Sequence, residues 1–216
     1  LEIGAGRGTK TYVMMCQAKR AGYERQHTAL DLHDRKCDQN LARLHKAGIS
    51  GVRTVSGDAC ELDEVLTSFD AMLGEPALFD TVFIDAPCSG TGTMRRHPEI
   101  PWRLTENDVT RELPKLQLTM LKEAAARVAV GGELIYATCS VFDEENTQVV
   151  DAFLASPEGE GFTVAPLSEA QILQLSEYDH AKSLVTLRQN ARGLFQSVPV
   201  NSDSYDGHFC ARLVRQ

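Results

Sequence analysis

Two cysteine-containing segments carry the residues most able to do chemistry. Asp85-Ala-Pro-Cys88-Ser-Gly-Thr-Gly92 follows the apolar run Phe79–Asp85, and Tyr136-Ala-Thr-Cys139-Ser140 overlaps the end of Glu133–Thr138. If both runs are neighbouring strands, both thiols project over one cleft beside Asp85. A thiol in such a loop becomes a nucleophile when nearby positive charge or a helix N-terminus lowers its pKa. The alternative is a pair of small buried cysteines near strand ends, and residue chemistry alone leaves both interpretations open.

A glycine-rich segment near the start of the chain indicates a cofactor loop. Gly4, Gly6 and Gly8 lie between a predicted strand and a predicted helix, where glycine allows a sharp turn and close approach to a ligand. Asp31 and Asp58 end the next two predicted strands, where the first could bind ribose hydroxyls and the second could lie near an adenine amino group. The spacing is GxGxG, whereas dinucleotide loops prefer GxGxxG, so the loop favours S-adenosylmethionine (SAM). The alternative to a cofactor site is that the acidic residues simply cap three loops.

The elements that must position these residues alternate between strand and helix. Strands are predicted at Leu1–Gly4, Thr28–Leu32, Val52–Val55, Phe79–Asp85, Glu133–Thr138 and His208–Val214. Helices are predicted at Thr9–Ala21, Asp34–Ala47, Leu62–Leu73, Leu116–Val130 (closed by Gly131-Gly132) and Glu144–Leu154. This alternation predicts an α/β protein with a mainly parallel sheet, in which ligands bind beyond the carboxyl ends of the strands.

Composition sets further limits. The 216 residues suit one domain, and no run is apolar enough for a transmembrane helix or resembles a signal peptide. The chain begins at Leu1, already inside a strand, so we expect a truncated first strand and an RNA-binding domain upstream. The six cysteines form no CxxC pair, which argues against zinc and a disulfide framework. We expect no metal, and buried cytosolic thiols at Cys16, Cys37, Cys60 and Cys210.

The motifs together resemble the Sun-type (RsmB-like) RNA cytosine-5 methyltransferases. The resemblance covers nearly the whole chain and rests on both cysteine motifs and on four further runs: Arg95-Arg-His97-Pro-Glu-Ile100 with Trp102, Gly131-Gly132 before the second motif, Glu144-Glu145-Asn146, and Asp206-Gly-His-Phe209. Two features depart from the family pattern. The cofactor loop has Arg7 and Thr9 where the family usually has Pro and Gly, and His208 replaces the second residue of the usual closing Gly-Phe-Phe.

The resemblance implies a Rossmann-like class I SAM-dependent methyltransferase fold, mainly parallel with an antiparallel C-terminal strand, spanning residues 1–216. It makes Cys139 the nucleophile, Cys88 the product-release residue and Asp85 a contact to the cytosine. Cys88 is the rival nucleophile, because the DNA enzymes use a Pro-Cys thiol. The implied SAM contacts are Glu2, Gly4, Ala5, Gly6, Gly8, Lys10, Asp31, Asp58, Asp85 and Pro87. Glu144-Glu145-Asn146 either support Cys139 or simply cap a helix.

The expected reaction is methyl transfer from SAM to cytosine C5 in RNA, with 16S rRNA favoured as the substrate. A tRNA enzyme, a catalytically inactive RNA-binding assembly factor and a small-molecule methyltransferase are the alternatives. We expect a cytoplasmic monomer that binds no membrane. Arg95, Arg96 and His97 are predicted to contact RNA phosphates, whereas Trp102 is equally a base-stacking or a packed residue.

The charge distribution bears on RNA binding. The net charge is −8, yet residues 91–103 contain three arginines and one glutamate, and 1–30 are also net positive. Binding to RNA requires local rather than net positive charge. The negative total therefore does not exclude RNA binding. It does lead us to expect that this chain alone binds RNA weakly.

Overall fold

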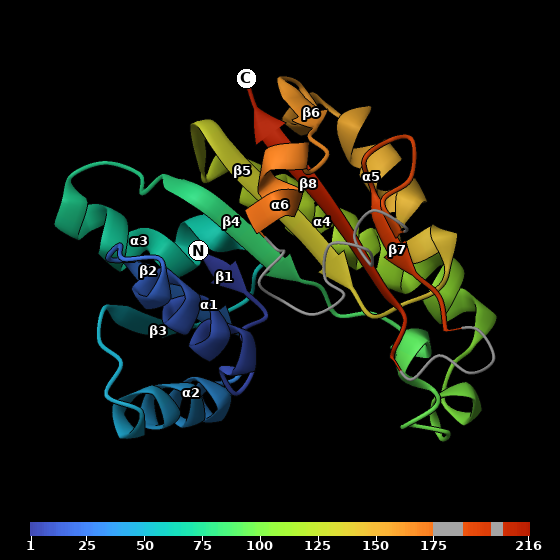
Figure 1. Cartoon of the computed structure of the whole chain (residues 1–216), viewed down its shortest axis with the longest axis horizontal. Helices are drawn as coiled ribbons and strands as arrows, with labels where there is room; N and C mark the ends of the chain where they lie inside the picture. The colour runs from blue at the N-terminus through green and yellow to red at the C-terminus, as the bar shows by residue number, and fades with distance from the viewer. Residues whose placement is uncertain (175–187, 200–204) are drawn as a thin grey trace.

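The architecture is a twisted sheet flanked by helices. The computed structural model describes residues 1–174, 188–199 and 205–216. The strands of these residues are β1 (Glu2–Ile3), β2 (His27–Asp31), β3 (Val52–Ser56), β4 (Phe79–Asp85), β5 (Val128–Thr138), β6 (Phe162–Val164), β7 (Phe195–Ser197) and β8 (His208–Arg215) (Figure 1). The helices are α1 (Thr9–Arg20), α2 (Asp34–Lys46), α3 (Leu62–Leu73), α4 (Leu113–Ala126), α5 (Thr147–Leu154) and α6 (Glu169–Gln174).

The strand order is β3-β2-β1-β4-β5-β8-β6, with β7 also paired to β8. Strands β1 to β5 are parallel to their neighbours, and β8 runs antiparallel to β5. The predicted α/β class and the antiparallel C-terminal strand are therefore confirmed. The chain passes from β1 outward to β3 and then returns to β4 on the other side of β1. This reversal opens a crevice beyond the ends of β1 and β4, where open α/β sheets bind their ligands.

The hydrophobic core lies along the central strands of the sheet. Five side chains on neighbouring strands are at most 1% exposed: Ile3, Leu30, Ile84, Leu134 and Tyr136. Strands β1 and β2 are buried along their whole length, as expected of strands covered on both faces, whereas β4 and β5 fully bury only alternate residues over much of their length. Burial of these side chains stabilises the sheet and fixes where each strand ends.

The segment after α4 corrects one prediction. The helix expected over Leu116–Val130 begins at Leu113 and ends at Ala126, and β5 begins at Val128. Gly131-Gly132 do not stop a helix: they lie within β5, where the register with β4 shifts between Phe79 and Thr81. The β-branched residues Val128 and Val130 favour the strand, and a positive φ of 77° makes Gly131 suitable for the irregularity.

The helix expected over Glu144–Leu154 is also interrupted. A 3₁₀ turn covers Asp143–Glu145, Asn146 adopts a non-helical conformation (φ −116°, ψ −97°), and α5 follows from Thr147. The side chains of Glu145 and Asn146 are buried and bonded to the cysteine loops, as described below. These bonds compete with continuous helix at this point.

The cysteines outside the two motifs are free thiols. Cys37 is buried, as predicted, and Cys60 and Cys210 are partly buried. Burial raises the pKa of Cys60 and of Cys210 to about 11. The prediction that Cys16 is buried is wrong: α1 buries the face that carries Thr11, Met15 and Ala18, and Cys16 lies outside it.

Candidate active site

The glycine loop brings the ends of β1 and β4 into close contact. Gly4 has a φ of 78°, and a Cβ there would lie 2.3 Å from the carbonyl oxygen of Asp85. Gly8 has a φ of 79° at the N-terminus of α1, and its Cβ would lie 1.9 Å from Asn40 Oδ1. Both positions therefore require glycine, for reasons of space as well as backbone conformation.

Glu2 lies beneath this loop and does not line its cavity. Its carboxylate is buried, accepts a hydrogen bond from Thr11 Oγ1 at 2.6 Å and lies 2.8 Å from His27 Nε2. Asn40 Nδ2 in turn donates to Thr11 Oγ1 at 3.1 Å. The structure thus gives Glu2 an anchoring position that joins β1, β2, α1 and α2.

A cavity of 410 Å³ opens at the crevice between β1 and β4. Six of the ten predicted cofactor residues line it: Gly4, Gly6, Asp31, Asp58, Asp85 and Pro87. Ala5 and Gly8 in the adjoining loop and Lys10 in the first turn of α1 do not line it. Nine further residues, which the sequence did not predict as cofactor contacts, also line it: Ile3, Leu30, Leu32, His33, Lys36, Gly57, Ala59, Leu116 and Met120. Leu116 and Met120, four residues apart on α4, were detectable only as an apolar helical face.

Asp31 is held in place by the backbone. Its Oδ2 accepts the Gly6 N–H at 2.9 Å, its Oδ1 accepts the His33 N–H at 3.1 Å, and Lys36 Nζ lies 3.3 Å from Oδ1. Asp58 Oδ1 accepts the Cys60 N–H at 2.9 Å. Two oriented carboxylates among apolar walls suit a ligand with hydroxyl and amino donors and an apolar face, which is the chemistry of a nucleoside.

The two motif thiols meet at the adjacent ends of β4 and β5. Cys88 Sγ and Cys139 Sγ are 3.3 Å apart, and the Cys139 N–H donates to Cys88 Sγ at 3.4 Å. Donation from the Cys88 S–H lowers the pKa of the Cys139 thiol and raises that of Cys88. Burial opposes ionisation at both sulfurs. The pair is therefore asymmetric, and Cys139 is the thiol whose ionisation the surroundings favour.

Lys10 and Asp85 lie beside the pair. Lys10 Nζ and Asp85 Oδ2 are 2.5 Å apart, and both side chains are partly exposed. The Lys10 charge lowers the pKa of Cys139, whereas the Asp85 charge raises it. Lys10 thus lies near Cys139 as the ion-pair partner of Asp85, rather than as part of the cavity lining.

A buried network fixes the positions of the two cysteine loops. Glu145 is fully buried and accepts the Ser89 N–H at 2.8 Å, the Ser140 hydroxyl at 2.7 Å and Gln117 Nε2 at 3.1 Å. One carboxylate therefore joins the loop after β4, the loop after β5 and helix α4. We call the residues Ser89, Gln117, Ser140 and Glu145 the loop clamp.

Backbone bonds continue this connection. The Gly92 N–H donates to the Cys139 carbonyl at 2.8 Å, and the Gly207 N–H donates to the Gly92 carbonyl at 2.8 Å. Asn146 accepts from Thr138 Oγ1 at 2.6 Å and donates to the Ser140 carbonyl at 3.0 Å. Two interpretations of Glu144-Glu145-Asn146 were open, support of Cys139 or simple helix capping. Glu145 and Asn146 support the Cys139 loop.

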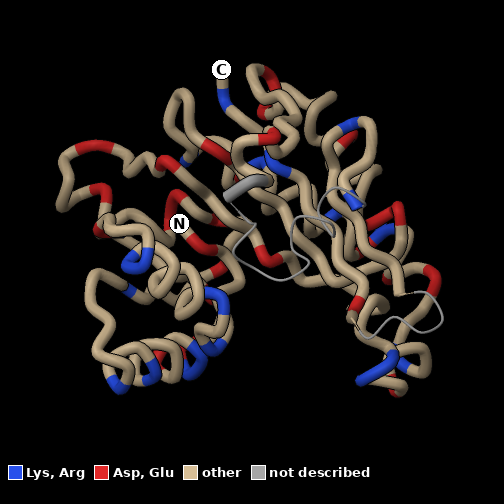
Figure 2. The backbone as a smooth tube through the Cα atoms, viewed as in Figure 1, with Lys and Arg blue, Asp and Glu red and all other residues tan. Residues whose placement is uncertain are grey.

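The basic segment after Cys88 lies at the surface, shown in green at the lower right of Figure 1 and with blue residues in Figure 2. Arg96 is paired with Asp206, on the segment between β7 and β8, through Nε at 2.8 Å and through its terminal nitrogen. His97 Nδ1 lies 3.4 Å from Glu99. The structure thus places Arg95, Arg96 and His97 on an exposed loop near the thiols, and joins Arg96 to Asp206.

This geometry has close counterparts among known proteins. The profile described as 16S rRNA methyltransferase RsmB/F matches residues 1–214. The chain belongs to the RsmB/F methyltransferase family. It is 34% identical to ribosomal RNA small subunit methyltransferase B of Yersinia pestis over 174 residues, which cover 77% of this chain and 37% of the relative. It is 47% identical to the Klebsiella pneumoniae (strain 342) protein of that name over 83 residues, covering 38% and 19%. The chain thus spans well under half of these RsmB/F relatives.

Solved structures agree on the fold. The crystal structure of PH0851 matches with a TM-score of 0.76 at 28% identity and covers 99% of this chain and 42% of its own. NSun6 from Pyrococcus horikoshii, solved with SFG, matches with a TM-score of 0.73 at 18% identity, covering 99% and 47%. The second likeness concerns the fold alone. The predicted RsmB-like family and the methyltransferase fold are thereby confirmed. Among the described residues, no helix is long and apolar enough to cross a membrane.

Proposed function

We propose that this chain transfers a methyl group from SAM to C5 of cytosine in RNA, with 16S rRNA as the preferred substrate. The observation that carries the proposal is the thiol pair, with Cys88 Sγ and Cys139 Sγ 3.3 Å apart beside the 410 Å³ cavity. A small-molecule methyltransferase does not need two thiols at this position. The names of the RsmB/F relatives favour rRNA over tRNA.

The cavity residues fit the proposed cofactor. Asp31 and Asp58 offer oriented carboxylate oxygens for ribose hydroxyls and an adenine amino group, and Leu116 and Met120 offer apolar surface. The close approach at Gly4 leaves backbone, rather than a side chain, at the end of β1. SAM, when bound there, supplies the methyl group.

Cys139 is the proposed nucleophile. Its thiolate adds to cytosine C6, so that an Sγ–C6 bond forms and the electrons of the C5–C6 double bond shift towards C5, which gains enamine character. Asp85, at the end of β4, is proposed to hydrogen-bond the edge of the cytosine and hold the ring in position during the addition. After methylation, a base takes the C5 proton and the Sγ–C6 bond breaks. The target base must leave any helix to reach the thiols.

Cys88 is the proposed release residue. The hydrogen bond with Cys139 and burial raise the pKa of the Cys88 thiol, so a proton donor stays beside the sulfur that must leave. In the resting state this S–H stabilises the Cys139 thiolate, and during elimination it stabilises the departing one. The two thiols therefore have different roles despite similar positions.

The remaining features fit a catalytic domain acting on RNA. We propose that residues 1–216 form this domain, that it is a cytoplasmic monomer, and that a separate region supplies most of the affinity for RNA. The net charge of −8 supports a separate binding region. We propose that Arg95, Arg96 and His97, which lie on the exposed loop after Cys88, contact RNA phosphates.

Incubation of the chain with isotopically labelled SAM and either 16S rRNA or tRNA tests the proposal. We expect labelled 5-methylcytidine in digested 16S rRNA, measured by mass spectrometry, and none with Cys139→Ala. Label on an exocyclic nitrogen, or label retained by Cys139→Ala, would contradict the mechanism. Preferential labelling of tRNA would move the substrate to tRNA. Calorimetry that shows no SAM binding would favour the inactive assembly factor.

A further inference from the structure

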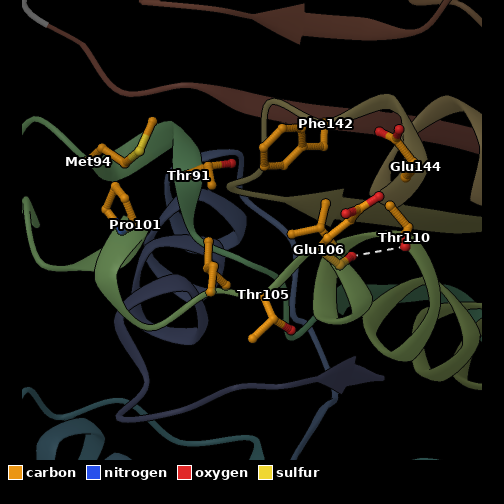
Figure 3. A pocket seen from close by; sticks show the side chains of 10 residues that line it. Thr91, Met94, Pro101, Thr105, Glu106, Thr110, Phe142 and Glu144 are labelled. Carbon is orange, nitrogen blue, oxygen red and sulfur yellow. Dashed lines mark hydrogen bonds between the residues drawn. The ribbon is translucent and has the colours of Figure 1, made fainter.

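A second cavity, of 360 Å³, lies beside the cysteine loops and has no role in the mechanism above. Figure 3 shows side chains from three segments around it: the loop after Cys88, the stretch up to the π-helical turn Asp108–Glu112, and the loop after Cys139. Its lining is mainly apolar and consists of Thr91, Met94, Pro101, Leu104, Thr105, Glu106, Val109, Thr110, Phe142 and Glu144. We call it the flanking cavity.

The flanking cavity is lined by residues that follow both cysteines closely in the chain. Thr91 follows Cys88 by three residues and Phe142 follows Cys139 by three, so each lies within about 11 Å of its cysteine along the backbone. Thr91 Oγ1 accepts the Val141 N–H at 3.1 Å, which joins the two walls. A single strand whose target base reaches the thiols can therefore place an adjacent nucleotide here.

The chemistry of the lining indicates a base with several donors. Phe142 and Met94 are 39% and 37% exposed and offer apolar faces for stacking. Among the described residues, neither the Glu106 nor the Glu144 carboxylate makes a hydrogen bond or ion pair, and both border the cavity (Figure 3). Carboxylates only accept hydrogen bonds when ionised, so they complement an edge rich in N–H groups.

We propose that the flanking cavity binds a guanine adjacent to the target cytosine. Guanine presents N1–H and N2–H₂ side by side, which one carboxylate can accept as a bidentate pair, whereas adenine and uracil each present one N–H position on that edge. The exposed arginine loop beside the cavity offers cations to phosphates. The inference rests on the proposed RNA substrate and gives that substrate a sequence preference.

Short single-stranded RNAs with one cytosine test this inference, with each of the four bases placed on its 5′ or its 3′ side. We expect guanine on one side to raise kcat/KM for methyl transfer by about tenfold to a hundredfold over uracil. Inosine, which lacks the N2 amino group, should lose most of that gain. Glu144→Gln should remove the guanine preference, whereas Asp143→Asn, an exposed neighbour that does not border the cavity, should keep it.

Binding provides a readout that does not need turnover. Trp102 is the single tryptophan, is 89% exposed and lies between the lining residues Pro101 and Leu104, so its fluorescence reports RNA at this loop. Guanine-containing RNA should bind about tenfold more tightly than its inosine counterpart. Equal binding and equal methylation for all bases would overturn the inference and leave the proposed function intact. Tighter guanine binding without methylation of any RNA would support the inference and contradict the proposed function.

Discussion

Glu144 and Glu145 are neighbours in sequence, yet they belong to two regions with opposite properties. Glu145 is fully buried in the loop clamp, where its two oxygens accept three hydrogen bonds. Glu144 is partly exposed at the flanking cavity, without a partner among the described residues. The carboxylate of Glu145 is hydrogen-bonded within the protein, whereas the carboxylate of Glu144 remains available to a ligand.

The difference separates a rigid part of the site, the loop clamp, from a part that is accessible to a ligand, the flanking cavity. The proposed covalent catalysis would require two sulfurs held in fixed relative positions, and a saturated buried network provides such rigidity. Recognition of RNA requires acceptors and apolar faces that remain available in the free protein. The two regions share the loops after β4 and β5, so the cavity that we propose for RNA recognition lies within a few residues of Cys88 and Cys139.

Removing each carboxylate in turn gives the largest contrast. Glu145→Ala should lower the free energy of unfolding by about 3 kcal/mol, because the Ser89 N–H, the Ser140 hydroxyl and Gln117 lose a buried acceptor. Glu144→Ala should change it by less than about 0.5 kcal/mol. Urea unfolding of the two variants measures both values. Similar losses in both would show that the clamp and the cavity are not distinct.

A paired change of aromatic residues makes the same comparison at smaller scale. The Tyr136 hydroxyl donates to the Glu145 carbonyl at 2.6 Å, so Tyr136→Phe should cost about 1 kcal/mol by leaving a buried carbonyl without its donor. Phe142→Ala should leave stability nearly unchanged but weaken RNA binding, since a stacked base is worth about 1–3 kcal/mol. Urea unfolding and an RNA titration separate the two effects. Strong destabilisation by Phe142→Ala would identify it as a packing residue.

The thiols themselves give a smaller, kinetic contrast. Only the thiolate is alkylated at an appreciable rate, and the pKa of Cys139 is lowered whereas that of Cys88 is raised. As pH rises, iodoacetamide should therefore label Cys139 first and Cys88 only under more alkaline conditions, as measured by peptide mass spectrometry. In Cys88→Ala the S–H donor is lost, and labelling of Cys139 near pH 7.5 should slow severalfold. Faster labelling of Cys88 in the unaltered protein would reverse the assignment of the two thiols.

The sequence was sufficient to predict the meeting of Cys88, Cys139 and Asp85, because parallel strands end at a common edge. It was also sufficient for the placement of Asp31 and Asp58 in one cavity. It did not predict that Glu2 anchors α1 and α2 through Thr11 and His27, because a short strand near a loop gives no sign of which way its side chains point.

Other features depend on packing between distant segments. Gly131-Gly132 read locally as a helix stop, and only pairing with β4 shows them to be an irregularity within β5. The flanking cavity arises where the 91–110 segment meets the loop after β5, and neither segment alone has a pattern that predicts it. The break at Asn146 depends instead on nearby contacts, with Thr138 and Ser140 at the end of β5.

The different roles of the two thiols are the central claim, and covalent trapping tests them most directly. Cys88→Ala and Cys139→Ala would each be incubated with SAM and RNA, then separated on a denaturing gel. The proposed roles predict a protein–RNA band that survives denaturation with Cys88→Ala, since the adduct forms but is released slowly, and no such band with Cys139→Ala. A stable band with Cys139→Ala and none with Cys88→Ala would contradict the account.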